Sequence, residues 1–210
     1  TDFGARAIAR ANALGMLVDV SHASDACIAD ALRVSRAPII ASHSSARALV
    51  DHKRNLTDDE LRAIAANGGV AQAVAYREFV KADPERYAAE EKLKDEVAKA
   101  AGDDEFDSEK HDTIPAYVEG MKLIEARWPR ATLSDFLDHI DHMVKVAGID
   151  HVGISSDFDG GGGVIGWKDA TETRNVAAGL RQRGYNEADI AKLWGGNLLR
   201  VWEAADAYAA

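Results

Sequence analysis

Two Ser-His pairs follow short apolar runs in this sequence. They stand in GMLVDVSH and APIIASH, and their histidines, His22 and His43, lie twenty-one positions apart. A third apolar run, HVGISS, leads directly to Asp157 and Asp159. Imidazole nitrogens and carboxylate oxygens are ligands for Zn²⁺ and similar borderline metals. If these side chains meet, the pattern predicts a metal site and favours metal-assisted hydrolysis.

Arg54 lies eleven positions after His43, in the loop DHKRNL. A guanidinium can bind a carboxylate through two parallel hydrogen bonds, so Arg54 is a candidate for holding a substrate carboxylate. An ordinary surface arginine is the alternative interpretation.

Several other features predict structural roles. His139 and His142 fall within a helix-like stretch rather than at a strand end. The run DGGGG lacks the spacing of a dinucleotide-binding loop and the Lys-Ser/Thr of a P-loop. Serines adjoin both strand-end histidines, but there is no G-x-S-x-G motif, which argues against a serine hydrolase.

Four apolar runs have the composition of buried parallel strands, being short, continuous and rich in Val, Ile and Ala. They are residues 16–20, 38–42, 69–75 and 151–155. Helix-like segments lie between them, which indicates an α/β fold with a parallel sheet. Functional side chains in such folds gather at the carboxyl ends of the strands. His22, His43 and Asp157 all fall there, and we expect the two histidine rings to come within ligand distance of one point.

Capping signals predict where the helices begin and end. Ser24 is placed to cap a helix through residue 32, and Thr57 with Glu60 forms a capping box in a helix that ends at Asn67-Gly68. Gly148 is expected to end a helix over 132–147, and two further helices are expected at 170–183 and 187–205. Cys27 lies in the apolar pattern DACIADAL and is expected to be buried.

Residues 77–112 differ from the rest of the chain in carrying thirteen Asp or Glu against seven Lys or Arg. We interpret this stretch as a solvated helical segment. It belongs to a helical insertion of approximately 77–135 within a single partial barrel domain, residues 1–210.

Composition limits the partners. A net charge of −10 without a Lys/Arg cluster argues against nucleic acid. No window approaches the ~20 apolar residues of a membrane span. The chain begins at Thr1 with neither Met nor a signal-peptide pattern, so we expect that this is not a natural N-terminus and leave the compartment open.

These motifs, in this order, resemble the membrane dipeptidase (renal dipeptidase) family of zinc metallopeptidases. The similar stretches are GMLVDVSHAS, PIIASHSSARALVDHKRNLTDDELRAIAANGGV, HVGISSDFDG and WGGNLLRVWEA. The resemblance implies a (β/α)₈ TIM barrel of the metal-dependent hydrolase type. At its mouth two zinc ions hydrolyse dipeptides, often with tolerance of a D-residue at the C-terminal position.

The resemblance also implies roles for individual residues. His22 and His43 correspond to two histidines that bind the second zinc. Arg54 corresponds to the residue that meets the substrate's terminal carboxylate. Asp157 corresponds to the acid/base residue, which also contacts the substrate, whereas Asp159 supports the loop.

One departure from the family pattern limits the prediction. The first zinc of the family is held by a His-x-Asp pair, and a glutamate bridges both metals, all upstream of the first Ser-His strand. Here only fourteen residues precede Gly15, and the single His-x-Asp, at 139–141, lies in a helix-like segment. We therefore expect the C-terminal half of the barrel, inactive alone and completed by a missing N-terminal half, in an enzyme that forms a homodimer.

An incomplete barrel is also expected to expose apolar surface along the strands that begin at Met16 and His151. Two other functions stay open at this point. One is a metal-dependent amidohydrolase that acts on a cyclic amide or lactone, and the other is a non-catalytic half-barrel used only for assembly.

Overall fold

The computed structural model describes residues 1–209, which form two compact units. The first, here called the sheet unit, comprises residues 1–81 and 131–209. The second, here called the helical unit, comprises Ala82–Arg130.

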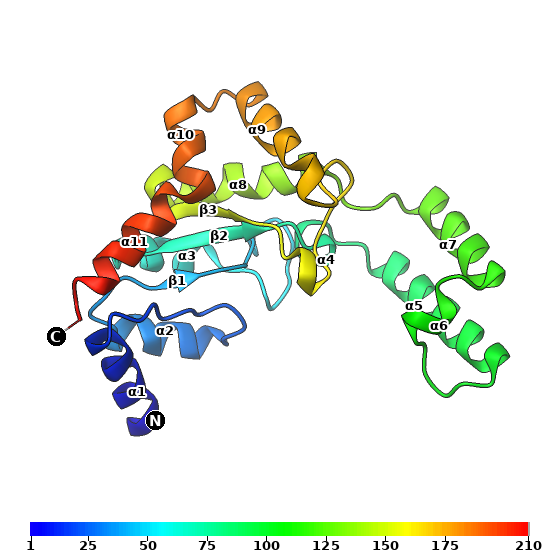
Figure 1. Ribbon diagram of the computed structural model, residues 1–210, viewed down its shortest axis with the longest axis horizontal. Helices are drawn as coiled ribbons and strands as arrows, with labels where there is room; N and C mark the ends of the chain where they lie inside the picture. Colours follow the sequence, from blue (N-terminus) through cyan, green and yellow to red (C-terminus); the bar gives the residue numbers. More distant parts are fainter. Residues whose placement is uncertain (210) are drawn as a thin grey trace. The chain divides into compact units, whose positions relative to one another are not determined.

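The sheet unit is built on three parallel strands that lie side by side in chain order (Figure 1). They are β1 (Ile40–Ala41), β2 (Val70–Val74) and β3 (Val152–Ser155). Ile40 pairs with Val70, and Ala71 pairs with Val152. The α/β fold class with a parallel sheet, predicted from the alternating pattern, is confirmed.

The two N-terminal strands are shorter than predicted. Residues 16–20 form only an isolated parallel bridge between Asp19 and Ile40. At the start of this run the Met16 N–H donates to Ala11 O at 2.9 Å rather than to a strand. The run 38–42 shrinks to β1, since the N–H of Ile39 donates to the Asn67 side chain at 2.8 Å. The carboxyl ends of both runs nevertheless lie next to each other.

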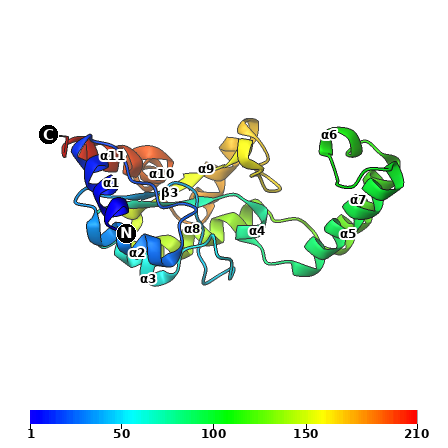
Figure 2. The same cartoon turned by 90° about the horizontal axis from the view of Figure 1, so that it is seen from below.

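Helices surround the strands of the sheet unit, with α2, α3 and α8 along one side and α10 and α11 along the other (Figure 2). The helices are α1 (Asp2–Ala13), α2 (Asp25–Val34), α3 (Asp58–Ala66), α4 (Arg77–Val80), α8 (Leu133–Ala147), α9 (Thr173–Gln182), α10 (Glu187–Ala191) and α11 (Asn197–Asp206). Short 3₁₀ turns occupy Ile149–His151, Phe158–Gly160 and Ala170–Glu172, and a π-helical turn, Lys192–Gly196, joins α10 to α11.

The predicted helix boundaries follow the capping chemistry. The Ser24 side chain accepts from Cys27 N, Thr57 and Glu60 complete their capping box, and Gly148 follows α8. The prediction that Cys27 is buried is wrong, because its side chain is exposed. Ile28 and Ala31 occupy the buried face of α2 instead.

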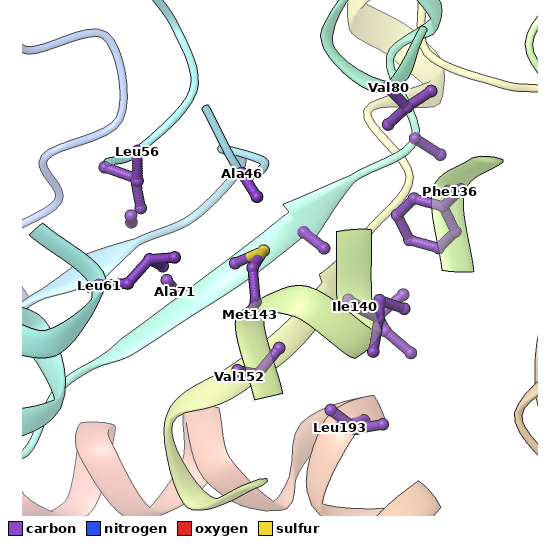
Figure 3. Close-up of a cluster of buried hydrophobic side chains, with 14 of the residues drawn as sticks. Ala46, Leu56, Leu61, Ala71, Val80, Phe136, Ile140, Met143, Val152 and Leu193 are labelled. Carbon is purple, nitrogen blue, oxygen red and sulfur yellow. The ribbon is translucent and has the colours of Figure 1, made fainter. Parts of the chain in front are cut away.

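The core of the sheet unit lies between α8 and the strands (Figure 3). Ile140 and Met143 of α8 are fully buried, together with Ala71 of β2 and Val152 of β3. Truncation of Ile140 or Met143 to alanine costs about 2–5 kcal/mol of folding stability, because the lost transfer free energy and the cavity that remains both destabilise the fold. This packing fixes the ends of β2 and β3 and therefore the loops that follow them.

The expectation of exposed apolar strands is half wrong. Val152 and Ile154 of β3 are only 0% and 6% exposed, because α8 and the π-helical turn cover them. Along the other run Met16 is 55% exposed, but Val18 is half-buried and Val20 is only 3% exposed, so the expectation holds there at Met16 alone.

The helical unit consists of α5 (Pro84–Ala101), α6 (Ser108–His111) and α7 (Pro115–Arg127). Its interior contains an ion pair in which Arg86 Nε lies 2.7 Å from Glu90 Oε1, with both side chains 3% exposed. His111 is also buried, where its Nδ1 accepts from Asp107 N and its Nε2 lies 2.9 Å from Asp103. In neither unit is any described helix long and apolar enough to cross a membrane.

Candidate metal centre at the strand ends

The rings of His22 and His43 are in contact at the carboxyl ends of the first two runs. Their Nε2 atoms lie 2.8 Å apart, and their ring centroids are separated by 4.9 Å with planes tilted by 60°. The two residues are far apart in sequence, and the parallel bridge between Asp19 and Ile40 brings their strand ends together.

This pair of nitrogens fits a shared metal ion. Two nitrogens bound to one tetrahedral Zn²⁺ at ~2.0–2.1 Å lie about 3.3 Å apart. Because the observed distance is 2.8 Å, the two Nε2 atoms need to move only slightly apart to bind one ion. Within residues 1–209 no group of three or more His, Cys, Asp or Glu side chains could hold a metal ion, so the pair would be part of a larger ligand set.

Hydrogen bonds position His43. The Ser42 hydroxyl lies 2.7 Å from Nδ1 of His43 and 2.6 Å from Oδ2 of Asp19. The His43 backbone N–H donates to Ser21 Oγ at 2.9 Å. Both the ring and the backbone of this residue are thus tied to neighbouring side chains.

Backbone geometry positions His22. Its φ is +71°, and Asp157 has a φ of +55°; no other described residue except glycine has a positive φ. This left-handed conformation costs roughly 1–2 kcal/mol for a residue with a Cβ, and such strain concentrates at functional sites. Both strained residues belong to the set predicted from the sequence.

Burial lowers the pKa of His43 below the ordinary imidazole value, and the Arg54 guanidinium lowers it further, while Asp157 partly opposes both. The ring is therefore neutral at pH 7, which is the form that binds metals.

Arg54 lies close to the same strand end. Its Nη2 donates to His43 O at 3.4 Å, and its guanidinium carbon lies 5.5 Å from the centroid of the Phe79 ring. Burial lowers the pKa of Arg54, while Asp157 and Asp19 raise it; the group remains a cation. Arg54 also lines a hollow of about 470 Å³ beside His22 and Lys53, within the usual size range of small-molecule sites.

Asp157 follows β3, in a loop where two positions have no room for a side chain and therefore require glycine. Gly160 and Gly162 donate their N–H groups to Asp157 O at 3.0 and 2.7 Å. A Cβ on Gly160 would lie 2.4 Å from Asp157 Oδ1, and one on Gly162 would lie 2.1 Å from Ser156 O. The run DGGGG thus allows the chain to wrap closely around Asp157. Asp159 is exposed.

The helix histidines have structural contacts. Nδ1 of His139 accepts from Ala46 N at 3.0 Å, and Nε2 of His142 lies 2.7 Å from Asp58. Sequence reasoning missed Asp19 and Phe79 as neighbours of the site. Asp19 lies three residues before His22, and nothing in the sequence marks its contact with Ser42. Phe79 lies twenty-five residues after Arg54, and only the folded structure brings its ring beside the Arg54 guanidinium.

Comparison with known proteins identifies the family. The membrane dipeptidase family, Peptidase family M19, matches residues 1–210. The chain belongs to this family. An uncharacterized dipeptidase of Schizosaccharomyces pombe is 34% identical over 209 residues, which cover 99% of this chain and 40% of that protein.

Solved structures agree. The probable dipeptidase PvdM of Pseudomonas aeruginosa has 40% identity and a TM-score of 0.79, with 100% of this chain and 55% of that one covered. A metallopeptidase of Rhodobacter sphaeroides, liganded with a phosphinate mimic of the dipeptide L-Ala-D-Ala, has 27% identity and a TM-score of 0.72, with coverage of 98% and 47%.

The solved structures of this family are TIM-barrel metal hydrolases. The chain spans 40% of the length of the S. pombe relative and about half of the solved ones. Its parallel strands and their helices therefore correspond to part of such a barrel.

Proposed function

We propose that this chain forms the second-zinc side of a dipeptidase that hydrolyses free dipeptides. The observation that carries the proposal is the contact of His22 and His43, whose Nε2 atoms meet 2.8 Å apart beside a half-buried arginine. Membership of a metallopeptidase family supports the same proposed function.

His22 and His43 would hold the ion through their Nε2 atoms. A bound Zn²⁺ would lower the pKa of a water toward neutrality and polarise the scissile carbonyl. Asp157 would accept the proton of the attacking water on its carboxylate and return it to the leaving amine. The close approach of Gly160 limits where that carboxylate can lie.

Arg54 would set the length of the substrate. Its guanidinium would pair with the terminal carboxylate of a dipeptide, and the His43 carbonyl and the Phe79 ring keep it in place. Tolerance of a D-residue at the C-terminal position is part of the proposal, because the Rhodobacter sphaeroides relative binds a mimic of L-Ala-D-Ala.

The remaining zinc ligands would come from an upstream half of the barrel. The described residues provide two histidines and no larger ligand group, and the chain covers 55% of the PvdM relative. We therefore propose that the 210 residues alone are inactive, and that the complete enzyme binds two zinc ions and is a homodimer.

A complementation experiment tests this function. The chain is assayed with Zn²⁺ alone and after co-expression with the N-terminal half of the PvdM relative, on L-Ala-D-Ala, L-Ala-L-Ala and their C-terminal amides. We expect hydrolysis of the free dipeptides only after co-expression. Replacement of Arg54 with Lys should lower kcat/KM by about 10- to 150-fold, since ~1.5–3 kcal/mol is typical of a hydrogen bond to a charged group.

The other outcomes point to the alternatives. Equal turnover of dipeptides and their amides, or turnover of a cyclic amide or lactone instead, would favour another amidohydrolase. Zinc binding without any turnover would favour a non-catalytic assembly role. Activity of the chain alone would refute the need for an upstream half.

A further inference from the structure

The carboxylate of Asp19 joins the two strand ends that carry the histidines. Its Oδ1 accepts the backbone N–H groups of Ser21 at 3.0 Å and Ser42 at 3.1 Å, and its Oδ2 accepts the Ser42 hydroxyl at 2.6 Å. Asp19 itself is exposed, whereas Ser42 and His43 are half-buried. Three hydrogen bonds therefore fix this carboxylate although it stands at the surface of the chain.

The single proton of the Ser42 hydroxyl decides the tautomer of His43. An ionised carboxylate can only accept a hydrogen bond, so the hydroxyl proton points to Asp19. Ser42 Oγ then accepts from Nδ1 of His43, 2.7 Å away. The ring proton is consequently on Nδ1, and Nε2 keeps its lone pair on the side that faces His22.

We propose that Asp19 and Ser42 are positioning residues, which form a relay that holds His43 in the Nδ1–H tautomer and directs its Nε2 lone pair to the metal. The proposal rests on the proposed metal site. Residues that orient a metal-bound imidazole through its second nitrogen contribute typically 10- to 100-fold to metal affinity.

The geometry argues against two simpler roles for Asp19. A direct ligand role would have to compete with the hydrogen bonds that both of its oxygens already accept from Ser21 and Ser42. A purely structural turn needs only the two backbone bonds to Oδ1, whereas Oδ2 is used separately for the hydroxyl that contacts His43.

The decisive variant is Asp19→Asn. An asparagine keeps the shape and can still accept both backbone N–H groups on its oxygen, but its NH₂ donates to Ser42 Oγ. The serine proton must then turn to Nδ1 of His43, which moves the ring proton to Nε2. Two-bond ¹H–¹⁵N spectra of the 210-residue chain, recorded without metal at a pH where the ring is neutral, should show this switch of tautomer.

Zinc titration provides the second readout. Asp19→Asn and Ser42→Ala should each weaken Zn²⁺ binding to the chain by about 10- to 100-fold. Ser42→Thr keeps the hydroxyl and should retain both the tautomer and the affinity. Ser44→Ala is the matched control, because Ser44 also adjoins His43 but its hydroxyl contacts Ser21 Oγ, not a ring.

The relay is refuted if Asp19→Asn keeps the Nδ1–H tautomer, whether or not zinc binding weakens. It is equally refuted if the tautomer changes while both variants bind zinc within about twofold of the unmodified chain. A failure of dipeptide hydrolysis would refute the proposed function alone, since the tautomer is measured without metal or substrate.

Discussion

The two Ser-His strand ends share a dipeptide but position their histidines by different means. His43 has its ring tied to Ser42 and its backbone N–H tied to Ser21. His22 is exposed, and the feature that fixes its direction is a left-handed backbone with φ of +71°. One ligand is thus held by a hydrogen-bond network and the other by backbone strain.

The segments that follow explain the difference. After His22 the chain enters α2 at Asp25 with Ser24 as N-cap, so it must turn within two residues. After His43 it enters a longer loop that packs inward, where Ser44, Ser45 and Ala46 are at most 1% exposed. A buried loop must satisfy its polar groups, and here Ser44 Oγ contacts Ser21 Oγ, which in turn accepts the His43 backbone N–H.

The largest expected effect concerns His139, whose ring accepts a hydrogen bond from the buried loop after His43. Its Nδ1 accepts from Ala46 N at 3.0 Å, so its Nε2–H donates to Val80 O at 3.3 Å. Burial lowers the pKa of His139 to about 4. Because the unfolded chain binds this proton near pH 6.5, stability should fall as pH decreases from about 6.5 to 4, by about 3 kcal/mol in total.

Urea unfolding of the chain across this range measures the effect. His139→Gln can accept and donate like the neutral ring without titrating, and should flatten the slope. His142→Gln, on the same helix but beside Asp58, serves as the control and should leave the slope in place. An unchanged slope in His139→Gln would show that acid acts elsewhere.

Local chemistry explains what the sequence could predict. The capping serine and threonine, the apolar runs and the side chains at their ends all act within a few residues. The sequence therefore predicts the caps at Ser24 and Thr57 and the contact of the His22 and His43 rings. The α/β class follows from the alternation of these same signals.

Contacts between distant segments explain what it could not. Strand β1 is short because the side chain of Asn67 takes the N–H of Ile39, and Arg54 packs on Phe79 from another element. Cys27 follows an apolar pattern, yet the buried face of α2 consists of Ile28 and Ala31. None of these contacts leaves a periodic or local signature.

The second test disturbs the other strained position, Asp157. Gly160→Ala places a Cβ 2.4 Å from Oδ1 of Asp157 and 3.0 Å from Oδ2, so the carboxylate must move. In the complemented enzyme we expect kcat/KM for L-Ala-D-Ala to fall by about 10- to 100-fold, since misplacement of a catalytic group by ~1 Å has an effect of this size. Zinc affinity should be unchanged, because Asp157 is proposed as acid/base and not as a ligand.

Gly195→Ala is the control for this variant, because a Cβ there would meet nothing within 4 Å and the φ of 175° is extended backbone. Weakened zinc binding in Gly160→Ala would instead place Asp157 among the ligands. Unchanged turnover would exclude Asp157 from proton transfer.

The smallest effect isolates the strain at His22 itself. His22→Asn and His22→Val both remove the imidazole, but asparagine tolerates a φ of +71° whereas a β-branched residue does not. The valine variant should therefore be less stable than the asparagine variant by roughly 1–2 kcal/mol in urea unfolding. The same two substitutions at His43, whose φ is not positive, should differ by less than about 0.5 kcal/mol. Equal differences at the two positions would mean that both histidines are held alike, and the contrast between strain and hydrogen bonding would be lost.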